Sequence, residues 1–245
     1  MKTAIIIPSR LSATRLPGKP LLKINGLSMI SHVVEKAKKA NIGKVYVATE
    51  DKEIVEDVEK NGGQAILTSN THKSGTDRVC EALSKIKDTR PDLVMNLQSD
   101  EPLINIEDIK NLNDLMIKSN SKFGTLGSNI QNEEFHENKN VVKVLTKQNL
   151  NISEFSEALN FTRDSLKNYE NVYHHLGIYC YQVETLKKFV SFDQSKNEIS
   201  NSLEQLRAMD NNITINVALA KSTPKGVDTL EDFVAIKKLM EYKSK

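Results

Sequence analysis

The chain of 245 residues has no tryptophan and only two cysteines, and its net charge of +2 is small. Cys80 and Cys180 form no CxxC pair, so the sequence indicates neither a disulfide framework nor a zinc site. No stretch approaches the roughly 20 apolar residues of a membrane helix. Pro8 and Arg10 interrupt the apolar N-terminal run too early for a signal peptide. Without a general basic field, nucleic-acid binding is disfavoured. We expect a cytoplasmic protein that binds neither membranes nor nucleic acid.

Several common catalytic motifs are also missing. Lys19 follows Gly18, as in the P-loop GxxxxGK[ST], but Pro20 stands where that motif needs serine or threonine. A Walker-type ATPase is therefore disfavoured. Spacing supports no Ser-His-Asp or Cys-His arrangement. His174 and His175 are adjacent on an expected strand, so they point to opposite faces and do not chelate one metal together.

The first half of the chain alternates between strand-like and helix-like segments. Ile5, Ile6 and Ile7 form a β-branched run, which is typical of a strand buried on both faces. Ser28 is expected to cap the first helix, and Thr76 to open a later one. Further strands are expected at 44–50, 64–68 and 92–97, and further helices at 51–63 and 106–120. This order predicts an α/β fold with a mostly parallel sheet and helices on both faces.

Beyond Lys122 the alternation stops. Strands are expected at 124–130, 141–147 and 174–182 with no helix between each pair, which indicates an antiparallel edge or a protruding lobe over roughly 123–182. Helices are expected again at 183–192, 198–209 and 228–242, with a last strand at 213–220. The sequence contains no internal repeat and no low-complexity linker. We therefore predict one domain, residues 1–245, with an inserted lobe.

Two loops at the carboxyl ends of expected strands carry opposite charges. Arg10, Arg15 and Lys19 follow the first strand, and Asp100 and Glu101 follow the strand that ends near residue 97. Three nearby cations repel one another unless an anion lies between them. Such loops suit a polyphosphate and its Mg²⁺, the basis of nucleotidyl transfer. The alternatives are a solvated basic loop and an acidic pair that caps the next helix.

Motifs in the same order along nearly the whole chain carry a more specific signal. They are "IIIPSRLSATRLPGKPL" (5–21), "HKSGTDRV" (72–79), "NLQSDEP" (96–102), "NVVKV" (140–144), "HLGIYCY" (175–181), "LEQLR" (203–207) and "GVDTLEDF" (226–233). Together they resemble the 3-deoxy-manno-octulosonate (Kdo) cytidylyltransferases, the CMP-Kdo synthetases. The resemblance implies a Rossmann-like nucleotidyltransferase fold with a small dimerisation lobe, a homodimer and a Mg²⁺ requirement. It also implies the conversion of CTP and Kdo to CMP-Kdo and pyrophosphate for lipopolysaccharide synthesis.

The resemblance also assigns roles to individual side chains. It implies that Arg10, Lys19 and Asp100 are catalytic and that Asp100 and Asp228 hold the metal. Nucleotide binding falls to residues of the first three motifs: Pro8, Arg10, Arg15, Lys19, Ser74, Arg78 and Gln98. Sugar binding falls to Gln98, Arg163, His175, Glu204 and Gln205. Arg163 lies in "NFTRD", which is similar to the family's FSR segment, and arginine presents a planar fork to a carboxylate.

The sequence departs from the family pattern at three points. Ser9 stands where the family usually has alanine, and Ser99 where it usually has glycine. The second basic cluster after Arg163 is missing, which leaves open a related sugar acid such as an amino-Kdo or a sialic acid. A non-catalytic CTP-binding protein is the alternative outside enzymes. Asp228 and Glu231 have the form of a capping box, so Asp228 could be a helix cap instead of a metal ligand.

Overall fold

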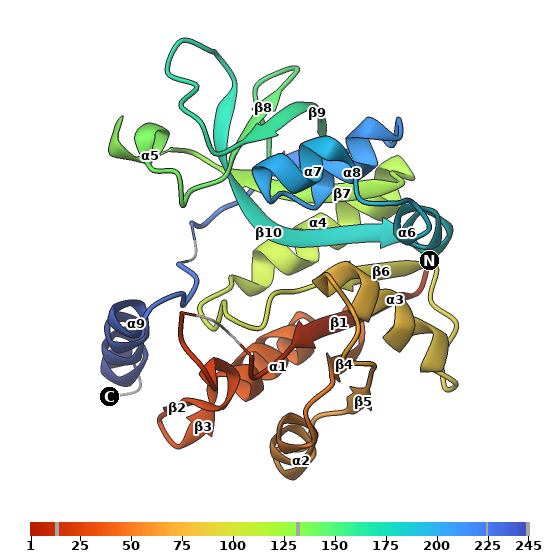
Figure 1. Ribbon diagram of the computed structural model, residues 1–245, viewed down its shortest axis with the longest axis vertical. Helices are drawn as coiled ribbons and strands as arrows, with labels where there is room; N and C mark the ends of the chain where they lie inside the picture. The colour runs from red at the N-terminus through yellow and green to blue at the C-terminus, as the bar shows by residue number, and fades with distance from the viewer. Residues whose placement is uncertain (13–14, 131–132, 224, 244–245) are drawn as a thin grey trace. The chain divides into compact units, whose positions relative to one another are not determined.

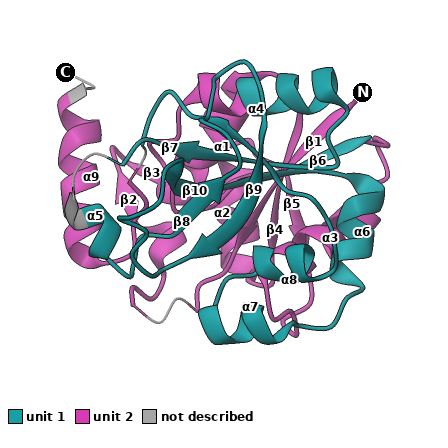
Figure 2. Ribbon diagram, turned by 90° about the horizontal axis from the view of Figure 1, so that it is seen from above, with its two compact units in different colours: residues 1, 92–95, 110–223 teal, residues 2–91, 96–109, 224–245 magenta. Residues whose placement is uncertain are grey.

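The structure is a computed structural model that describes residues 1–12, 15–130, 133–223 and 225–243. The chain forms two compact units, each assembled from separate stretches (Figure 2). Unit 2 contains residues 2–91, 96–109 and 224–245, and unit 1 contains residue 1, 92–95 and 110–223. The predicted lobe at 123–182 lies within unit 1. The chain crosses between the units several times, so neither unit is a simple half of the sequence.

Unit 2 is built on three parallel strands, β1 (Thr3–Ser9), β4 (Gly43–Thr49) and β5 (Ala65–Leu67) (Figure 1). All residues of β1 are buried, and Ile5, Ile6 and Ile7 are fully inaccessible to solvent. This confirms the prediction of a strand covered on both faces. Because the strands are parallel, the loops that follow them emerge at the same edge.

Helices α1 (Met29–Ala40), α2 (Lys52–Lys60) and α3 (Gly75–Lys85) connect or follow these strands. Ser28 caps α1 as predicted, because its hydroxyl accepts a hydrogen bond from the Ser31 backbone N–H at 3.3 Å. Helix α3 starts at Gly75 and not at the predicted Thr76. Its cap is Ser74, whose hydroxyl accepts from the Asp77 N–H at 3.2 Å.

Short elements complete unit 2. A 3-10 turn, η1 (Lys19–Leu21), precedes the two-residue strands β2 (Lys23–Ile24) and β3 (Leu27–Ser28), which pair antiparallel. Near the end of the chain, helix α9 (Leu230–Lys243) packs through an apolar cluster against the residues around β2. The cluster fixes the segment that leads into α9 and consists of Ile24, Met29, Val227, Phe233 and Ile236.

Unit 1 is a mixed sheet with strand order β6-β10-β7-β11-β9-β8. The strands are β6 (Leu93–Asn96, whose last residue belongs to unit 2), β7 (Phe123–Ser128), β8 (Lys143–Thr146), β9 (Ser156–Thr162), β10 (Val172–Gln182) and β11 (Asn216–Leu219). Strand β11 runs parallel to β7, whereas β10 with β7, β10 with β8, β9 with β8 and β11 with β9 are antiparallel. The α/β class is therefore confirmed, and apart from the short pair β2–β3 the antiparallel pairs named here lie in the unit that contains the predicted lobe.

The remaining helices are α4 (Ile106–Ser119), α5 (Glu133–Glu137), α6 (Val183–Val190), α7 (Lys196–Asn201) and α8 (Gln205–Asp210). The single helix predicted at 198–209 is thus two short helices. Ser202 separates them with a left-handed backbone (φ 51°), and a buried ion pair between Glu198 and Arg207 joins them at 2.7 Å. In the described part of the chain, no helix is both long and apolar enough to cross a membrane.

Candidate functional site

Four segments of unit 2 surround a cavity of about 400 Å³. Three of them follow strands: the loop after β1, the loop between β5 and α3, and the loop after β6. The fourth is the segment before α9. The first and third segments are neighbours because the Leu97 N–H donates to the Ile6 carbonyl at 3.2 Å. The lining residues are Pro8, Ser9, Arg10, Arg15, Leu16, Lys19, Pro20, His72–Gly75, Arg78, Gln98–Asp100 and Asp228.

The basic loop after β1 is anchored at its centre. The Leu11 N–H donates to the Asp51 carboxylate at 2.7 Å, and the Leu11 carbonyl accepts from the Gly18 N–H at 3.0 Å. Gly18 has φ +71°, a left-handed conformation that glycine adopts without the penalty of a Cβ. The closed loop leaves Arg10 and Arg15 exposed beside the cavity. The geometry therefore supplies cations where an anionic ligand could reach them.

The third cation of the loop, Lys19, joins the acidic residues of the site. Its Nζ donates to Asp100 Oδ2 at 2.8 Å and to the Val227 carbonyl at 2.6 Å, and it lies 3.7 Å from Asp228 Oδ1. The Lys19 side chain is only 12% exposed. Sequence reasoning predicted Lys19 and both carboxylates as site residues, and the structure brings them together around one ammonium group.

The oxygen atoms around Lys19 Nζ also suit a divalent cation. Two carboxylates and a backbone carbonyl are the hard oxygen donors that Mg²⁺ prefers, and phosphate oxygens and water complete its shell. The Val227 N–H donates to the Asp100 carbonyl at 2.9 Å, which holds the two acidic segments at a fixed spacing. Residues 1–12, 15–130, 133–223 and 225–243 contain no group of three or more His, Cys, Asp or Glu side chains placed to bind a metal. A metal here would therefore depend on ligand phosphates.

The start of α9 is capped by residues other than Asp228. Thr229 Oγ1 accepts from the Asp232 N–H at 3.2 Å, and Asp232 Oδ2 accepts from the Thr229 N–H at 2.9 Å. This reciprocal pair is a capping box one position later than the one proposed from the sequence. The Asp228 carboxylate instead turns to Arg15, 3.1 Å away, and to Lys19.

Glu101 does not cap the next helix either. Helix α4 is started by Asn105, whose side-chain oxygen accepts from the Glu107 N–H at 2.9 Å. Glu101 Oε2 is buried and has no hydrogen-bond partner among the described residues. Burial, and to a lesser extent the neighbouring Asp100 charge, raises the pKa of Glu101 to about 8. The carboxyl group of Glu101 is therefore neutral near pH 7.

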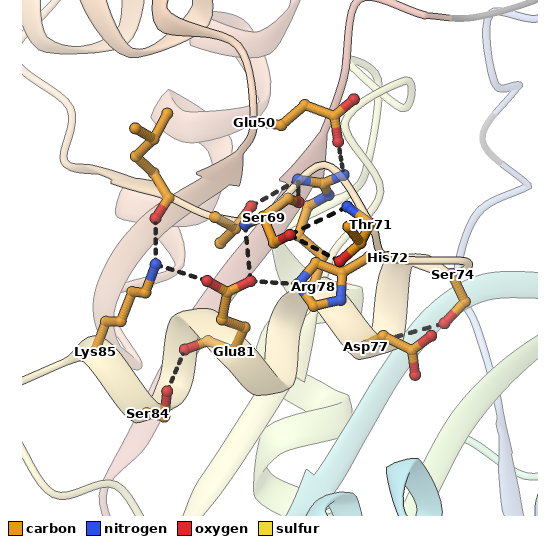
Figure 3. A network of polar contacts seen from close by, with 12 residues as sticks. Glu50, Ser69, Thr71, His72, Ser74, Asp77, Arg78, Glu81, Ser84 and Lys85 are labelled. Carbon is orange, nitrogen blue, oxygen red and sulfur yellow. Dashed lines mark hydrogen bonds and ion pairs between the residues drawn. The ribbon is translucent and has the colours of Figure 1, made fainter. Parts of the chain in front are cut away.

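Arg78 lines the cavity, but its guanidinium binds other groups of the protein (Figure 3). It pairs with Glu50 and donates to Thr68 Oγ1 at 2.6 Å and to the Ser69 carbonyl at 3.2 Å. Its side chain is 4% exposed. In this structure Arg78 holds the loop between β5 and α3, so its predicted contact with the nucleotide stays a prediction. Ser74, its neighbour in the motif, caps α3 at the cavity wall.

Gln98 and the other predicted sugar-binding residues lie in different units. Gln98 lines the cavity of unit 2, and its Nε2 donates to Asn96 Oδ1 at 3.4 Å. The predicted sugar-binding residues Arg163, His175, Glu204 and Gln205 all lie in unit 1, so no single unit unites them with this cavity.

The surroundings of these unit 1 residues differ. Arg163 donates to the carbonyls of Lys139 and Asn140 at 3.2 and 3.3 Å. Its own carbonyl accepts from the buried Lys143 ammonium at 2.7 Å. His175 is buried, and its Nε2 lies 3.0 Å from Thr125 Oγ1. Burial lowers the pKa of His175 to about 3, with a smaller effect from His174, so this ring is neutral.

Glu204 and Gln205 lie at the start of α8. Gln205 is buried and its Oε1 accepts from the Tyr179 hydroxyl at 3.4 Å. Glu204 is 3.8 Å from Arg207. The burial of His175 and Gln205 makes them weaker candidates for direct sugar contacts than Arg163, and all these sugar contacts stay predictions.

Comparisons with known proteins give one consistent answer. The model of the family described as cytidylyltransferase matches residues 4–215. Two similar curated relatives are 3-deoxy-manno-octulosonate cytidylyltransferases. That of Thermodesulfovibrio yellowstonii is 42% identical over 98% of both chains, and that of Bartonella tribocorum is 41% identical over 98% of this chain and 99% of the relative. A solved CMP:2-keto-3-deoxy-manno-octonic acid synthetase in complex with CTP has a TM-score of 0.90, 36% identity, and coverage of 99% of this chain and 100% of that one.

Proposed function

Because the chain belongs to the cytidylyltransferase family, we propose that it transfers CMP from CTP to the anomeric hydroxyl of Kdo, giving CMP-Kdo and pyrophosphate. The observation that carries this proposal is the cavity of unit 2, where cations of one loop face two carboxylates of other segments. Such an arrangement suits a triphosphate with its metal. The product would supply an activated sugar acid for lipopolysaccharide synthesis.

The residues of the cavity would act mainly by positioning and charge neutralisation. Arg10 and Arg15 are exposed at the cavity and bind the triphosphate. Lys19 exchanges its carboxylate partners for phosphate oxygens as the nucleotide enters. The sugar oxygen then forms a bond to the α-phosphorus, the bond from that phosphorus to the pyrophosphate oxygen breaks, and the hydroxyl proton passes to solvent. The cations of the loop stabilise the charge that develops on the leaving pyrophosphate.

Asp100 and Asp228 would hold Mg²⁺ together with phosphate oxygens, as their convergence on one cation indicates. When bound, Mg²⁺ supplies charge neutralisation at the phosphates and lowers the pKa of a coordinated hydroxyl. The neutral Glu101 beside Asp100 adds no further negative charge to this pair near pH 7.

Arg163 is the proposed partner of the sugar-acid carboxylate, since a guanidinium forms bidentate hydrogen bonds with a carboxylate. Gln98, His175, Glu204 and Gln205 are proposed to surround the sugar hydroxyls. A homodimer and a cytoplasmic location belong to the same proposal. Cys80 and Cys180 form no disulfide with each other in the described part of the chain, as is usual in a reducing compartment.

Pyrophosphate release tests the proposal. The enzyme is incubated with CTP, Mg²⁺ and, in parallel, Kdo, an amino-Kdo or a sialic acid. Release that requires Kdo supports the proposal. Faster release with another sugar acid would select the second candidate, which the missing basic cluster after Arg163 favours. CTP binding without release in any mixture would select the non-catalytic protein.

A further inference from the structure

His72 lines the cavity but belongs to none of the roles assigned above. It lies in the loop between β5 and α3, two residues before the cap residue Ser74. Its side chain is 18% exposed, and its Nε2 contacts the Oε2 atom of Glu81, which lies on α3 (Figure 3). A histidine at the wall of a ligand cavity, backed by a carboxylate, is a common arrangement for orienting the ring.

Glu81 is bound from several sides. Its Oε2 also accepts from the Ser69 N–H at 2.9 Å, and its Oε1 pairs with Lys85 Nζ at 2.6 Å. Burial alone would raise the pKa of Glu81, but the hydrogen bonds from Lys85, His72 and Ser69 outweigh burial and lower this pKa to about 2. The group is therefore a carboxylate, which only accepts hydrogen bonds.

This carboxylate decides which ring nitrogen of His72 carries the proton. Because Glu81 has no proton to give, His72 Nε2 must donate. In the neutral ring the other nitrogen, Nδ1, is then an acceptor. Figure 3 shows this nitrogen on the side of the ring away from Glu81. The loop is held firmly as well, because Arg78 binds the Ser69 carbonyl while Glu81 binds the Ser69 N–H.

We propose that His72, oriented by Glu81, accepts a hydrogen bond from a donor group of the nucleoside, and that Glu81 is its positioning residue. The two candidate donors on cytidine are the 4-amino group of the base and the 2′-hydroxyl of the ribose. The first would distinguish CTP from UTP, whose base has an acceptor at that position. This inference rests on the proposed function, because it takes the cavity to be the CTP site.

A double-mutant cycle on the CTP dissociation constant tests the coupling. It is measured by calorimetry with Mg²⁺ and without sugar acid. We expect His72→Ala to weaken CTP binding about tenfold, as for one lost hydrogen bond. Glu81→Ala should weaken it about fivefold in the wild-type background and less than twofold in the His72→Ala background. Lys85→Ala is the matched control, because it removes the partner of the other Glu81 oxygen and lies outside the cavity lining, and it should leave CTP binding unchanged.

Binding measurements with CTP, UTP and 2′-deoxy-CTP identify the group that donates to His72. A His72→Ala loss that is confined to CTP and absent with UTP assigns the 4-amino group, whereas a loss with both but not with 2′-deoxy-CTP assigns the ribose. Equal losses with all three nucleotides would overturn the inference. So would unchanged CTP binding in His72→Ala, or equal effects of Glu81→Ala in both backgrounds.

Thermal melts check that each variant is folded. If Glu81→Ala does not fold, Glu81→Gln replaces it. The comparison of the three nucleotides with His72→Ala does not depend on the Glu81 variants. Wild-type protein that binds no CTP would refute the proposed function as well, whereas normal wild-type binding with an insensitive His72 refutes only this inference.

Discussion

Substitution of Asp228 by asparagine separates ligand chemistry from folding. The structure gives this carboxylate two ion pairs, at 3.1 Å to Arg15 and 3.7 Å to Lys19, and leaves it 49% exposed. Such exposed pairs contribute about 0.2–1 kcal/mol each at most. Because Thr229 and Asp232 form the helix cap, Asp228→Asn should lose only these two pairs and lower the melting temperature by no more than about 8 °C.

Turnover should respond far more strongly. Asparagine keeps the oxygen atom but removes a negative charge from the pair proposed to hold Mg²⁺. We expect at least a roughly hundredfold loss of kcat, equivalent to about 2.7 kcal/mol, with partial recovery at high Mg²⁺. The assay is pyrophosphate release over a Mg²⁺ titration.

Thr229→Ala is the matched control at the next position. It removes a capping hydroxyl, which should cost about 1 kcal/mol of unfolding free energy, and should keep turnover. Near-normal activity of Asp228→Asn at limiting Mg²⁺ would refute the metal assignment. An unchanged free energy of unfolding in Thr229→Ala would refute the assignment of the helix cap to Thr229.

Four other variants follow from the same structure. Lys19→Ala should lower kcat by at least about a hundredfold. It should also lower the melting temperature, because the 12% exposed side chain joins two segments of unit 2. Wild-type turnover would refute the role of Lys19 in stabilising phosphate charge. Ser9→Ala should raise the free energy of unfolding by about 1 kcal/mol in urea titrations without loss of turnover, since the buried Ser9 hydroxyl has no hydrogen-bond partner among the described residues. A lower urea midpoint would contradict this. His175 has a folded pKa of about 3, below its ordinary 6.5, so the stability that its neutral ring contributes is present above pH 6.5 and is lost as the pH falls. His175→Gln should remove up to about 2 kcal/mol of the difference in unfolding free energy between pH 6.5 and pH 5. An unchanged pH dependence would count against a neutral buried ring. Arg163→Ala should raise KM for the sugar acid far more than for CTP in steady-state kinetics, and equal rises would indicate a structural role.

Local signals were enough to predict much of unit 2. The β-branched run of Ile5–Ile7 and the cap at Ser28 depend on neighbours in the sequence, and both are confirmed. The basic and acidic loops were placed correctly at one edge because parallel strands bring their carboxyl ends together. The pattern therefore located the cavity before any distance was known.

Long-range partners were not predictable in the same way. Lys19, Asp100 and Val227 meet through chain segments that lie far apart in sequence, and nothing in their local pattern specifies that one ammonium joins them. The cap of α9 is Thr229, one residue after Asp228, and the apolar periodicity of a helix does not define its first residue that closely.

Two features of unit 1 were missed for local reasons. Strand β9 has an irregular burial pattern, in which Leu159 and the next residue, Asn160, are both exposed, and so its sequence gave no clear alternation. The left-handed turn at Ser202, a residue that seldom takes positive φ, split a helix that the apolar spacing had joined.

Phosphorus NMR of one reaction mixture tests the central claim most directly. With CTP, Kdo, Mg²⁺ and enzyme, the three CTP resonances should be replaced by the single phosphodiester resonance of CMP-Kdo and the resonance of pyrophosphate, in equal amounts of product. Unchanged CTP, or conversion to CDP and inorganic phosphate, would contradict the account, because either result would show that the cavity does not direct the α-phosphorus of CTP to the sugar acid.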